Sequence, residues 1–190
     1  MARFWFVRHG ESVANAEGWL AGHTDAPLTP TGRDQAVALR TRMTALHPQR
    51  VWSSDLARAV DTARLAWTEA TPRLEIHPVL RERTVGAWET LPRDELRARG
   101  GFDSLLTWRE RPPGGESQRD LAQRVLAGLA TLDDGSDTLL FVHGGLIRVI
   151  VGLLDDTPVE TIGRWNVRNT EIVERDVRRG HWQSLLSSLP

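Results

Sequence analysis

The sequence predicts an α/β protein of three layers, in which helices cover both faces of a mostly parallel central sheet. The first observation is an alternation along the 190 residues, because short apolar runs typical of buried strands are followed by stretches with apolar residues at helical spacing. The second is that three apolar runs end abruptly in polar residues and glycine, at 8–11, 53–55 and 143–145. In such sheets the carboxyl ends of the strands meet at one edge, and ligands bind there.

The first half of the chain contains two of the expected helices. Thr29 and Pro30 form an N-cap and a first-turn proline, and the helix that they open has an apolar face of Ala36, Leu39, Met43 and Leu46. Asp55 is placed to cap a second helix, whose inner face is Leu56, Ala59, Val60, Ala63 and Trp67. Short apolar runs before, between and after these helices predict strands at 4–7, 51–52 and 74–76.

The second half begins with a weaker pattern. Arginines mixed with a few apolar residues predict short helices at about 92–111, lying over the core as a cap. Ser117 and Asp120 resemble a capping box, which begins a helix that extends to Leu132. The run 138–142 is the best strand, and a helix follows it to residue 154, while 172–173 and 182–186 are interpreted as late edge strands. No long linker divides the chain, so we expect one domain over 1–190.

The composition excludes several kinds of chemistry. All 24 basic residues are arginines, and the chain has no cysteine. Schiff-base catalysis, a phosphate-binding P-loop lysine, a thiolate nucleophile and a zinc–thiolate site are therefore excluded. The net charge of −1 gives no general attraction to nucleic acid or to an anionic membrane, and we expect neither as a partner. The apolar runs are too short for a signal peptide or a bilayer span, so we expect a cytoplasmic protein; the sequence makes no prediction of the oligomeric state.

The first polar cluster indicates phosphoryl chemistry. His9 follows Arg8 and precedes Gly10, which permits a ligand to approach the backbone closely. A helix start after residue 10 would direct free N–H groups at an anion. A neutral imidazole is a nucleophile toward phosphorus, and the adjacent guanidinium disfavours the charged imidazolium. For an isolated histidine, a bond to a backbone carbonyl at the strand end remains the simpler interpretation.

A larger set of motifs resembles the histidine phosphatase superfamily, also called the phosphoglycerate-mutase-like family. The five residues Arg8-His9-Gly10-Glu11-Ser12 resemble its signature, which is fairly specific by itself. The similarity continues in the family's order to about residue 150, through Asn15, Gly22, Asp25, Leu28-Thr29, Gly32, Gln35-Ala36, 53–59, Thr62-Ala63, Leu80-Arg81-Glu82, Gly86, Trp88-Glu89, 113–116 and His143-Gly144-Gly145.

The resemblance implies the roles of five side chains. In this family the histidine at the position of His9 is transiently phosphorylated, and Arg8, Arg58 and His143 match residues that surround the phosphoryl group. Such donors stabilise the charge that builds on the phosphoryl oxygens. Glu82 matches the general acid, which protonates the leaving group and then takes a proton from water.

The resemblance also implies contacts beyond the reacting atoms. Asn15 and the backbone amide of Gly144 are expected to bind the phosphoryl group. Relatives use the loop that contains His23 and Thr24 to line the entrance, so both residues are candidates for substrate contact. Trp19 and Trp88 lie near the motifs and are candidates for the pocket wall. The family uses no metal and we expect no cofactor; two histidines without a third ligand do not indicate zinc.

The implied activity is hydrolysis of a small phosphorylated metabolite. The family's mutase branch carries a longer, lysine-containing insertion after the general-acid region, whereas the segment 92–111 is short and has no lysine. This favours a phosphatase over the alternative, a cofactor-dependent phosphoglycerate mutase. Arg81, Arg83 and the cap arginines predict a site for a second anionic group on the substrate.

Other interpretations of the same residues stay open at this point. Arg58 can be a surface residue of its helix, Glu82 can be a solvated salt-bridge partner of its neighbours, and Glu11 is more simply a structural carboxylate at a helix start. Thr90 departs from the glycine that often follows Trp-Glu in the family, which puts the shape of that loop in doubt. A catalytically silent module that binds RNA through the arginines of 92–111 is a third class of function.

Overall fold

The computed structural model of the protein describes residues 1–43 and 45–190, and within them five strands form one sheet. The strand order is β3-β2-β4-β1-β5. Neighbouring strands run parallel except β5, which lies antiparallel to β1 at one edge. The predicted mostly parallel α/β sheet is therefore confirmed. The strands are β1 (Ala2–Arg8), β2 (Arg50–Ser53), β3 (Leu74–Ile76), β4 (Thr138–Val142) and β5 (Ile172–Val177).

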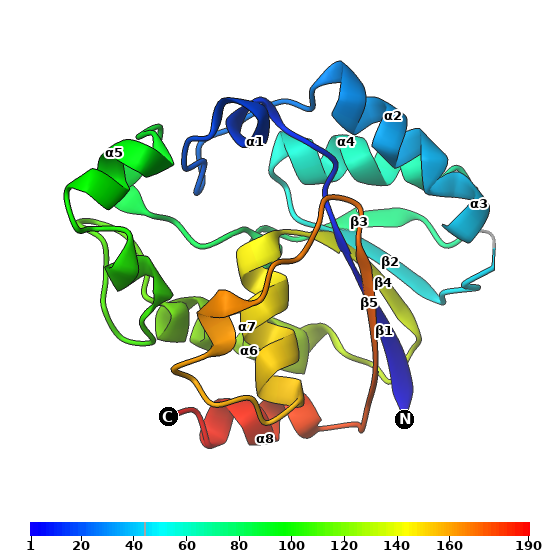
Figure 1. Ribbon diagram of the computed structural model, residues 1–190. Helices are drawn as coiled ribbons and strands as arrows, with labels where there is room; N and C mark the ends of the chain where they lie inside the picture. The colour runs from blue at the N-terminus through cyan, green and yellow to red at the C-terminus, as the bar shows by residue number, and fades with distance from the viewer. Residues whose placement is uncertain (44) are drawn as a thin grey trace.

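Helices cover both faces of this sheet (Figure 1). One face carries α2 (Pro30–Ala38), α3 (Arg40–Met43) and α4 (Ala57–Ala66), and the other carries α6 (Gln118–Leu132), α7 (Gly144–Leu154) and α8 (His181–Ser187). Alternate residues of β1 point to opposite faces, so Trp5 and Val7 belong to the first core while Phe4 and Phe6 belong to the second.

Short helices lie beside the layers. They are α1 (Val13–Glu17), α5 (Arg93–Ala98) and the 3-10 helices η1 (Pro78–Leu80), η2 (Gly86–Trp88), η3 (Asp103–Leu106) and η4 (Ile162–Arg164). Where the sequence places the cap, the structure has α5 and η3. They pack through a small apolar cluster of Val85, Leu96 and Leu105 that is separate from the two main cores. None of the helices in the described residues is long and apolar enough to cross a membrane.

Three sequence-based expectations about elements are wrong. The helix expected from residue 30 to 46 is interrupted at Leu39, whose N–H bonds to the carbonyl three residues earlier; part of the expected span, residue 44, lies outside the described residues. Residues 182–186 belong to α8 rather than to a strand. Trp182 is fully buried against Phe4, and the apolar residues at 182, 185, 186 and 189 follow helical spacing.

The third correction concerns the cap of α4. Asp55 does not cap this helix, because its carboxylate accepts two hydrogen bonds from Arg81, at 2.8 and 2.6 Å. The carboxylate that binds the helix start is Asp25, which accepts a bond from the Ala57 N–H at 2.8 Å. The capping box of Ser117 and Asp120 is confirmed.

Candidate active site

The two histidines of the motifs meet at the carboxyl edge of the sheet. Arg8 and Val142 are paired across β1 and β4, so His9 and His143 leave neighbouring strands at the same level. Their ring centroids lie 5.3 Å apart. A cavity of about 560 Å³ opens over this edge, and its walls include Arg8, His9, Asn15, Arg58, Glu82 and Gly144. His143 lies directly behind this wall and is fully buried.

His9 is held as a neutral base. Its Nδ1 lies 2.7 Å from the carbonyl oxygen of Gly10, and since a carbonyl only accepts, Nδ1 carries the proton. The pKa of His9 is lowered well below its usual value by burial, and the nearby Arg58 and Arg8 guanidinium groups lower it further. The other ring nitrogen, Nε2, therefore has a free lone pair at neutral pH.

The backbone around His9 is fixed from two sides. The Gly10 N–H donates to Thr62 Oγ1 at 2.9 Å, and Asn169 Nδ2 donates to the His9 carbonyl at 2.9 Å. A side chain at residue 10 would place its Cβ 2.4 Å from the carbonyl oxygen of Gly32. Glycine is thus required where the loop after β1 crosses the start of α2.

Two guanidinium groups, of half-buried Arg8 and buried Arg58, lie near the histidines. Arg8 donates from Nη1 to the Val167 carbonyl at 2.5 Å, and its buried Nε has no hydrogen-bond partner among the described residues. Arg58 is only 2% exposed and donates to the Gly22 and Thr24 carbonyls at 2.8 and 3.1 Å. The surface interpretation of Arg58 is therefore wrong. Burial lowers the pKa of Arg8 to about 10 and also lowers that of Arg58, but Arg8 stays charged at neutral pH.

His143 is the N-cap residue of α7 and carries two unpartnered ring nitrogens. Both are buried, and neither has a hydrogen-bond partner within residues 1–43 and 45–190. Burial, followed by the charge of Arg58, lowers the pKa of His143 well below its usual value. Gly144 begins the helix next to Arg8, where a Cβ would lie 3.3 Å from the Arg8 Nε. The first N–H groups of α7 have no partner within the helix and face this edge of the cavity.

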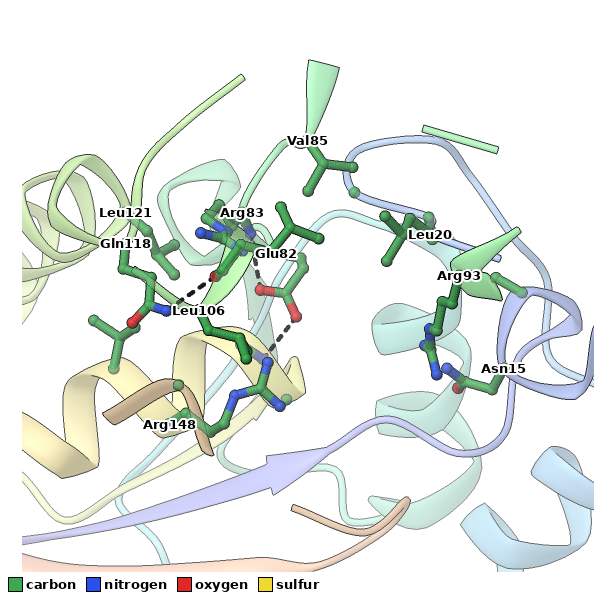
Figure 2. Close-up of a pocket in the computed structure, with 18 of the residues that line it drawn as sticks. Asn15, Leu20, Glu82, Arg83, Val85, Arg93, Leu106, Gln118, Leu121 and Arg148 are labelled. Atoms are coloured by element: carbon green, nitrogen blue, oxygen red, sulfur yellow. Dashed lines mark hydrogen bonds between the residues drawn. The ribbon is translucent and has the colours of Figure 1, made fainter. Parts of the chain in front are cut away.

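Glu82 lies inside the cavity rather than in solvent. Its Oε2 accepts a bond from the Gly145 N–H at 2.8 Å, and its Oε1 accepts one from the Arg83 N–H at 2.8 Å. Figure 2 shows the carboxylate between Arg148 and Leu20. Its neighbour Arg81 is bound to Asp55, so the salt-bridge interpretation of Glu82 is wrong. Of the described residues that line the cavity, Glu82 is the one carboxylate.

Asn15 presents its amide nitrogen to the cavity. Its Oδ1 accepts bonds from the Ser12 N–H and from Asn169 Nδ2, both at 3.2 Å. The Nδ2 group is therefore the donor that remains, and Figure 2 shows it beside Arg93. Glu11 binds Thr29 Oγ1 at 2.7 Å, in agreement with its structural interpretation.

His23 and Thr24 do not line the cavity. His23 Nε2 bonds to the Glu82 carbonyl at 2.8 Å, and the Thr24 hydroxyl donates to Glu89 at 2.6 Å. Glu89 also accepts bonds from the His23 and Thr24 N–H groups and from Thr84. The two residues therefore build the wall that holds Arg58, and the neighbouring residues 19–22 form its inner surface.

The arginines of the cavity differ in part from those expected. Arg83 and two cap residues, Arg93 and Arg97, line it, but Arg81 does not, because Asp55 binds it. Trp88 packs in the small cluster under the cap, and the tryptophans of the wall are Trp19 and Trp165. The described residues contain no group of three or more His, Cys, Asp or Glu side chains placed to hold a metal ion.

Sequence reasoning missed four residues of the site. Arg148 and Arg164 line the cavity with Trp165, and Asn169 holds the backbone of His9. The sequence does contain a signal for Arg148. It is the one charged residue in an otherwise apolar helix, and it lies four residues after Gly144, on the same face of the helix. The others lie at the end of η4 and in the irregular segment between η4 and β5, where the sequence has no periodic pattern from which to place them.

Comparisons with known proteins agree with this geometry. A family model of the histidine phosphatase superfamily (branch 1) matches residues 4–189. The chain is 33% identical to the probable phosphoglycerate mutase GpmB of Enterobacter sp. (strain 638) over 189 residues, which cover 96% of this chain and 88% of that protein.

Two solved structures are similar over most of their length. A mycobacterial glucosyl-3-phosphoglycerate phosphatase in complex with VO3 superposes with a TM-score of 0.82 at 28% identity and covers 92% of each chain. A putative alpha-ribazole-5'-P phosphatase of Escherichia coli gives a TM-score of 0.80 at 29% identity, covering 91% of this chain and 89% of that one. On this evidence, and on the family model above all, the chain belongs to branch 1 of the histidine phosphatase superfamily.

Proposed function

We propose that this protein hydrolyses phosphomonoesters through a phosphohistidine formed on His9. One observation carries the proposal: Nδ1 of His9 is bound to the Gly10 carbonyl, which leaves Nε2 with a free lone pair, and the guanidinium groups of Arg58 and Arg8 lie close enough to lower the pKa of His9. A base with a fixed lone pair beside fixed cations is suited to attack on a phosphoryl group.

The first step transfers the phosphoryl group to the enzyme. His9 Nε2 forms a bond to phosphorus as the bond from phosphorus to the ester oxygen breaks. Glu82, in its protonated form, gives its proton to that oxygen, so the product alcohol leaves neutral. Arg8, Arg58 and His143 donate hydrogen bonds to the phosphoryl oxygens, where negative charge builds in the transition state.

The second step returns the enzyme to its starting state. A water molecule attacks phosphorus, the phosphorus–nitrogen bond breaks, and the Glu82 carboxylate takes the proton that the water loses. Inorganic phosphate leaves, and His9 is again neutral with its proton on Nδ1. Gly145 and Arg83 hold the two carboxylate oxygens through backbone N–H groups, which keeps Glu82 in place for both proton transfers.

The test uses p-nitrophenyl phosphate and two asparagine variants. We expect the wild-type protein to release p-nitrophenol and phosphate, and His9→Asn to lose this activity. The control is His47→Asn, at an exposed histidine outside the cavity with a φ of 48°, where asparagine is well tolerated. Rapid quenching with an alkaline detergent solution should trap a base-stable, acid-labile phosphate on the wild-type protein. Full activity of His9→Asn at unchanged folding would refute the mechanism.

A phosphoglycerate mutase is the second candidate. The name of the relatives at 33% identity favours it. The names of the two solved phosphatases and the short segment after Glu82 support hydrolysis instead. Interconversion of 2- and 3-phosphoglycerate with a bisphosphoglycerate primer, measured beside phosphate release, separates the two activities. Mutase turnover well above the rate of phosphate release would reverse the proposal.

A further inference from the structure

The cavity holds more positive charge than a single phosphoryl group needs. Seven arginines line it in the described residues, against the single carboxylate of Glu82. Arg8 and Arg58 flank His9, and Arg97 is paired with Asp94 at 2.7 Å. Arg164 is exposed at the rim. The arginines that remain are Arg83, Arg93 and Arg148, and no carboxylate within the described residues forms a salt bridge with them.

Arg83 and Gln118 each keep an unpaired polar atom on the cavity side of the cap. Arg83 Nη2 and Gln118 Nε2 both donate to the Leu105 carbonyl, at 2.8 and 3.1 Å, which places the two side chains side by side. Arg83 Nη1 and Gln118 Oε1 are buried and have no hydrogen-bond partner in the described part of the chain. A buried donor and a buried acceptor left unpaired are costly, unless a ligand binds them.

Arg148 lies beside this pair. It projects from α7, about one turn beyond Gly145, whose N–H binds Glu82, and it lines the same cavity. Figure 2 shows Arg83, Gln118 and Arg148 on one side of Glu82, and Arg93 with Asn15 on the other. No side-chain hydrogen bond to the Arg148 guanidinium is present among residues 1–43 and 45–190. The arrangement leaves two guanidinium groups and one amide oxygen facing a common space.

We propose that Arg83 and Arg148 form a second anion site, separated from the phosphoryl site by Glu82, with Gln118 beside it as an acceptor for a hydroxyl group. The substrate class that fits is a phosphomonoester with a second anionic group, a carboxylate or a phosphate, and a hydroxyl group near it. Guanidinium groups bind either anion through paired hydrogen bonds. This proposal rests on the proposed hydrolysis at the same site, and it adds which substrates are selected.

The test compares substrates that differ in the second anion. One pair is 3-phosphoglycerate and glycerol 3-phosphate, and the other, with a longer spacing, is fructose 1,6-bisphosphate and fructose 6-phosphate. For the wild-type protein, we expect kcat/KM to be at least about tenfold higher for the doubly anionic member of one pair. Arg148→Gln and, separately, Arg83→Gln should reduce that ratio by about tenfold. The matched control is Arg109→Gln, at an exposed arginine outside the cavity, which should preserve the ratio.

Equilibrium binding keeps this test independent of turnover. The same four compounds are titrated by calorimetry into His9→Asn, with and without Arg148→Gln. A preference of His9→Asn for the doubly anionic member, lost with Arg148→Gln, supports the anion site even if the wild-type protein hydrolyses none of the compounds. Equal kcat/KM within both pairs, or a ratio that both arginine variants leave unchanged, would overturn the anion site while leaving hydrolysis intact. Absence of hydrolysis and of a trapped phosphoenzyme would instead refute the proposed function.

Discussion

The two buried histidines should make folding stability depend on pH in a measurable way. His9 is 4% exposed and His143 is fully buried, and burial lowers the pKa of both in the folded protein. In the unfolded chain each has an ordinary pKa of about 6.5. As the pH falls below that value, the unfolded chain takes up a proton at each histidine and the folded protein does not. The unfolding free energy therefore decreases by about 1.4 kcal/mol per pH unit for each histidine, and by about 2.7 kcal/mol for both.

Urea unfolding at pH steps between about 7 and 5.5 measures this slope. The His143→Asn variant removes one of the two groups. Because this range brackets the unfolded-state pKa of about 6.5, its mean slope should be smaller than that of the wild-type protein by about 0.8 kcal/mol per pH unit, and the difference should approach about 1.4 only at lower pH. Comparing slopes cancels the contribution of His77, whose pKa burial also lowers. Exposed His47 is the control, and His47→Asn should retain the wild-type slope.

One outcome would refute this reasoning. If His143→Asn and the wild-type protein have the same slope within about 0.3 kcal/mol per pH unit, His143 is protonated in the folded protein at these pH values. The inference that His143 is neutral in the folded protein would then be wrong. Inorganic phosphate is left out of the buffers, because an anion bound near the histidines would change the slope.

Two further predictions concern the geometry of the site. Gly145→Ala places a Cβ 2.3 Å from Glu82 Oε1, so the Glu82 carboxyl group must move. We expect kcat on an alkyl phosphate to fall by about 100-fold. The loss on p-nitrophenyl phosphate should be smaller, because its leaving group needs no proton. Equal losses on the two substrates would contradict the role of Glu82. Arg58→Lys replaces a guanidinium group that binds two carbonyls with a single ammonium group. We expect kcat/KM on p-nitrophenyl phosphate to fall by about 100-fold or more. A loss below about threefold would argue against a contact between Arg58 and the phosphoryl group.

The sequence predicted well the positions of the site residues that directly follow a strand. Buried strands are short apolar runs, and the residues directly after them are fixed in space once the sheet is parallel. His9 and His143 were therefore placed at the same edge without any knowledge of tertiary contacts. Arg58 lies one helical turn beyond such an end, but the resemblance to the family was what assigned it to the phosphoryl group.

The parts that were missed depend on contacts between distant segments. Asp55 is a good cap by local rules, but Arg81 competes for its carboxylate and Asp25 binds the helix start instead. Residues 182–186 are apolar enough for a strand, but Trp182 is buried against Phe4, and this packing favours a helix. Whether an arginine lines the cavity or binds a carboxylate is likewise set by its spatial neighbours, as Arg81 and Arg83 illustrate.

The segment just before β5 has a consequence for how the protein is made. Val167 binds the Arg8 guanidinium, Asn169 binds the His9 carbonyl, and the Thr170 N–H binds the Arg8 carbonyl at 3.0 Å. The ribosome synthesises His9 160 residues before Asn169. A nascent chain thus carries His9 long before anything holds it in position. Chains that stop before Val167 should therefore be inert toward phosphate esters, because neither Val167 nor Asn169 is present to hold Arg8 and His9.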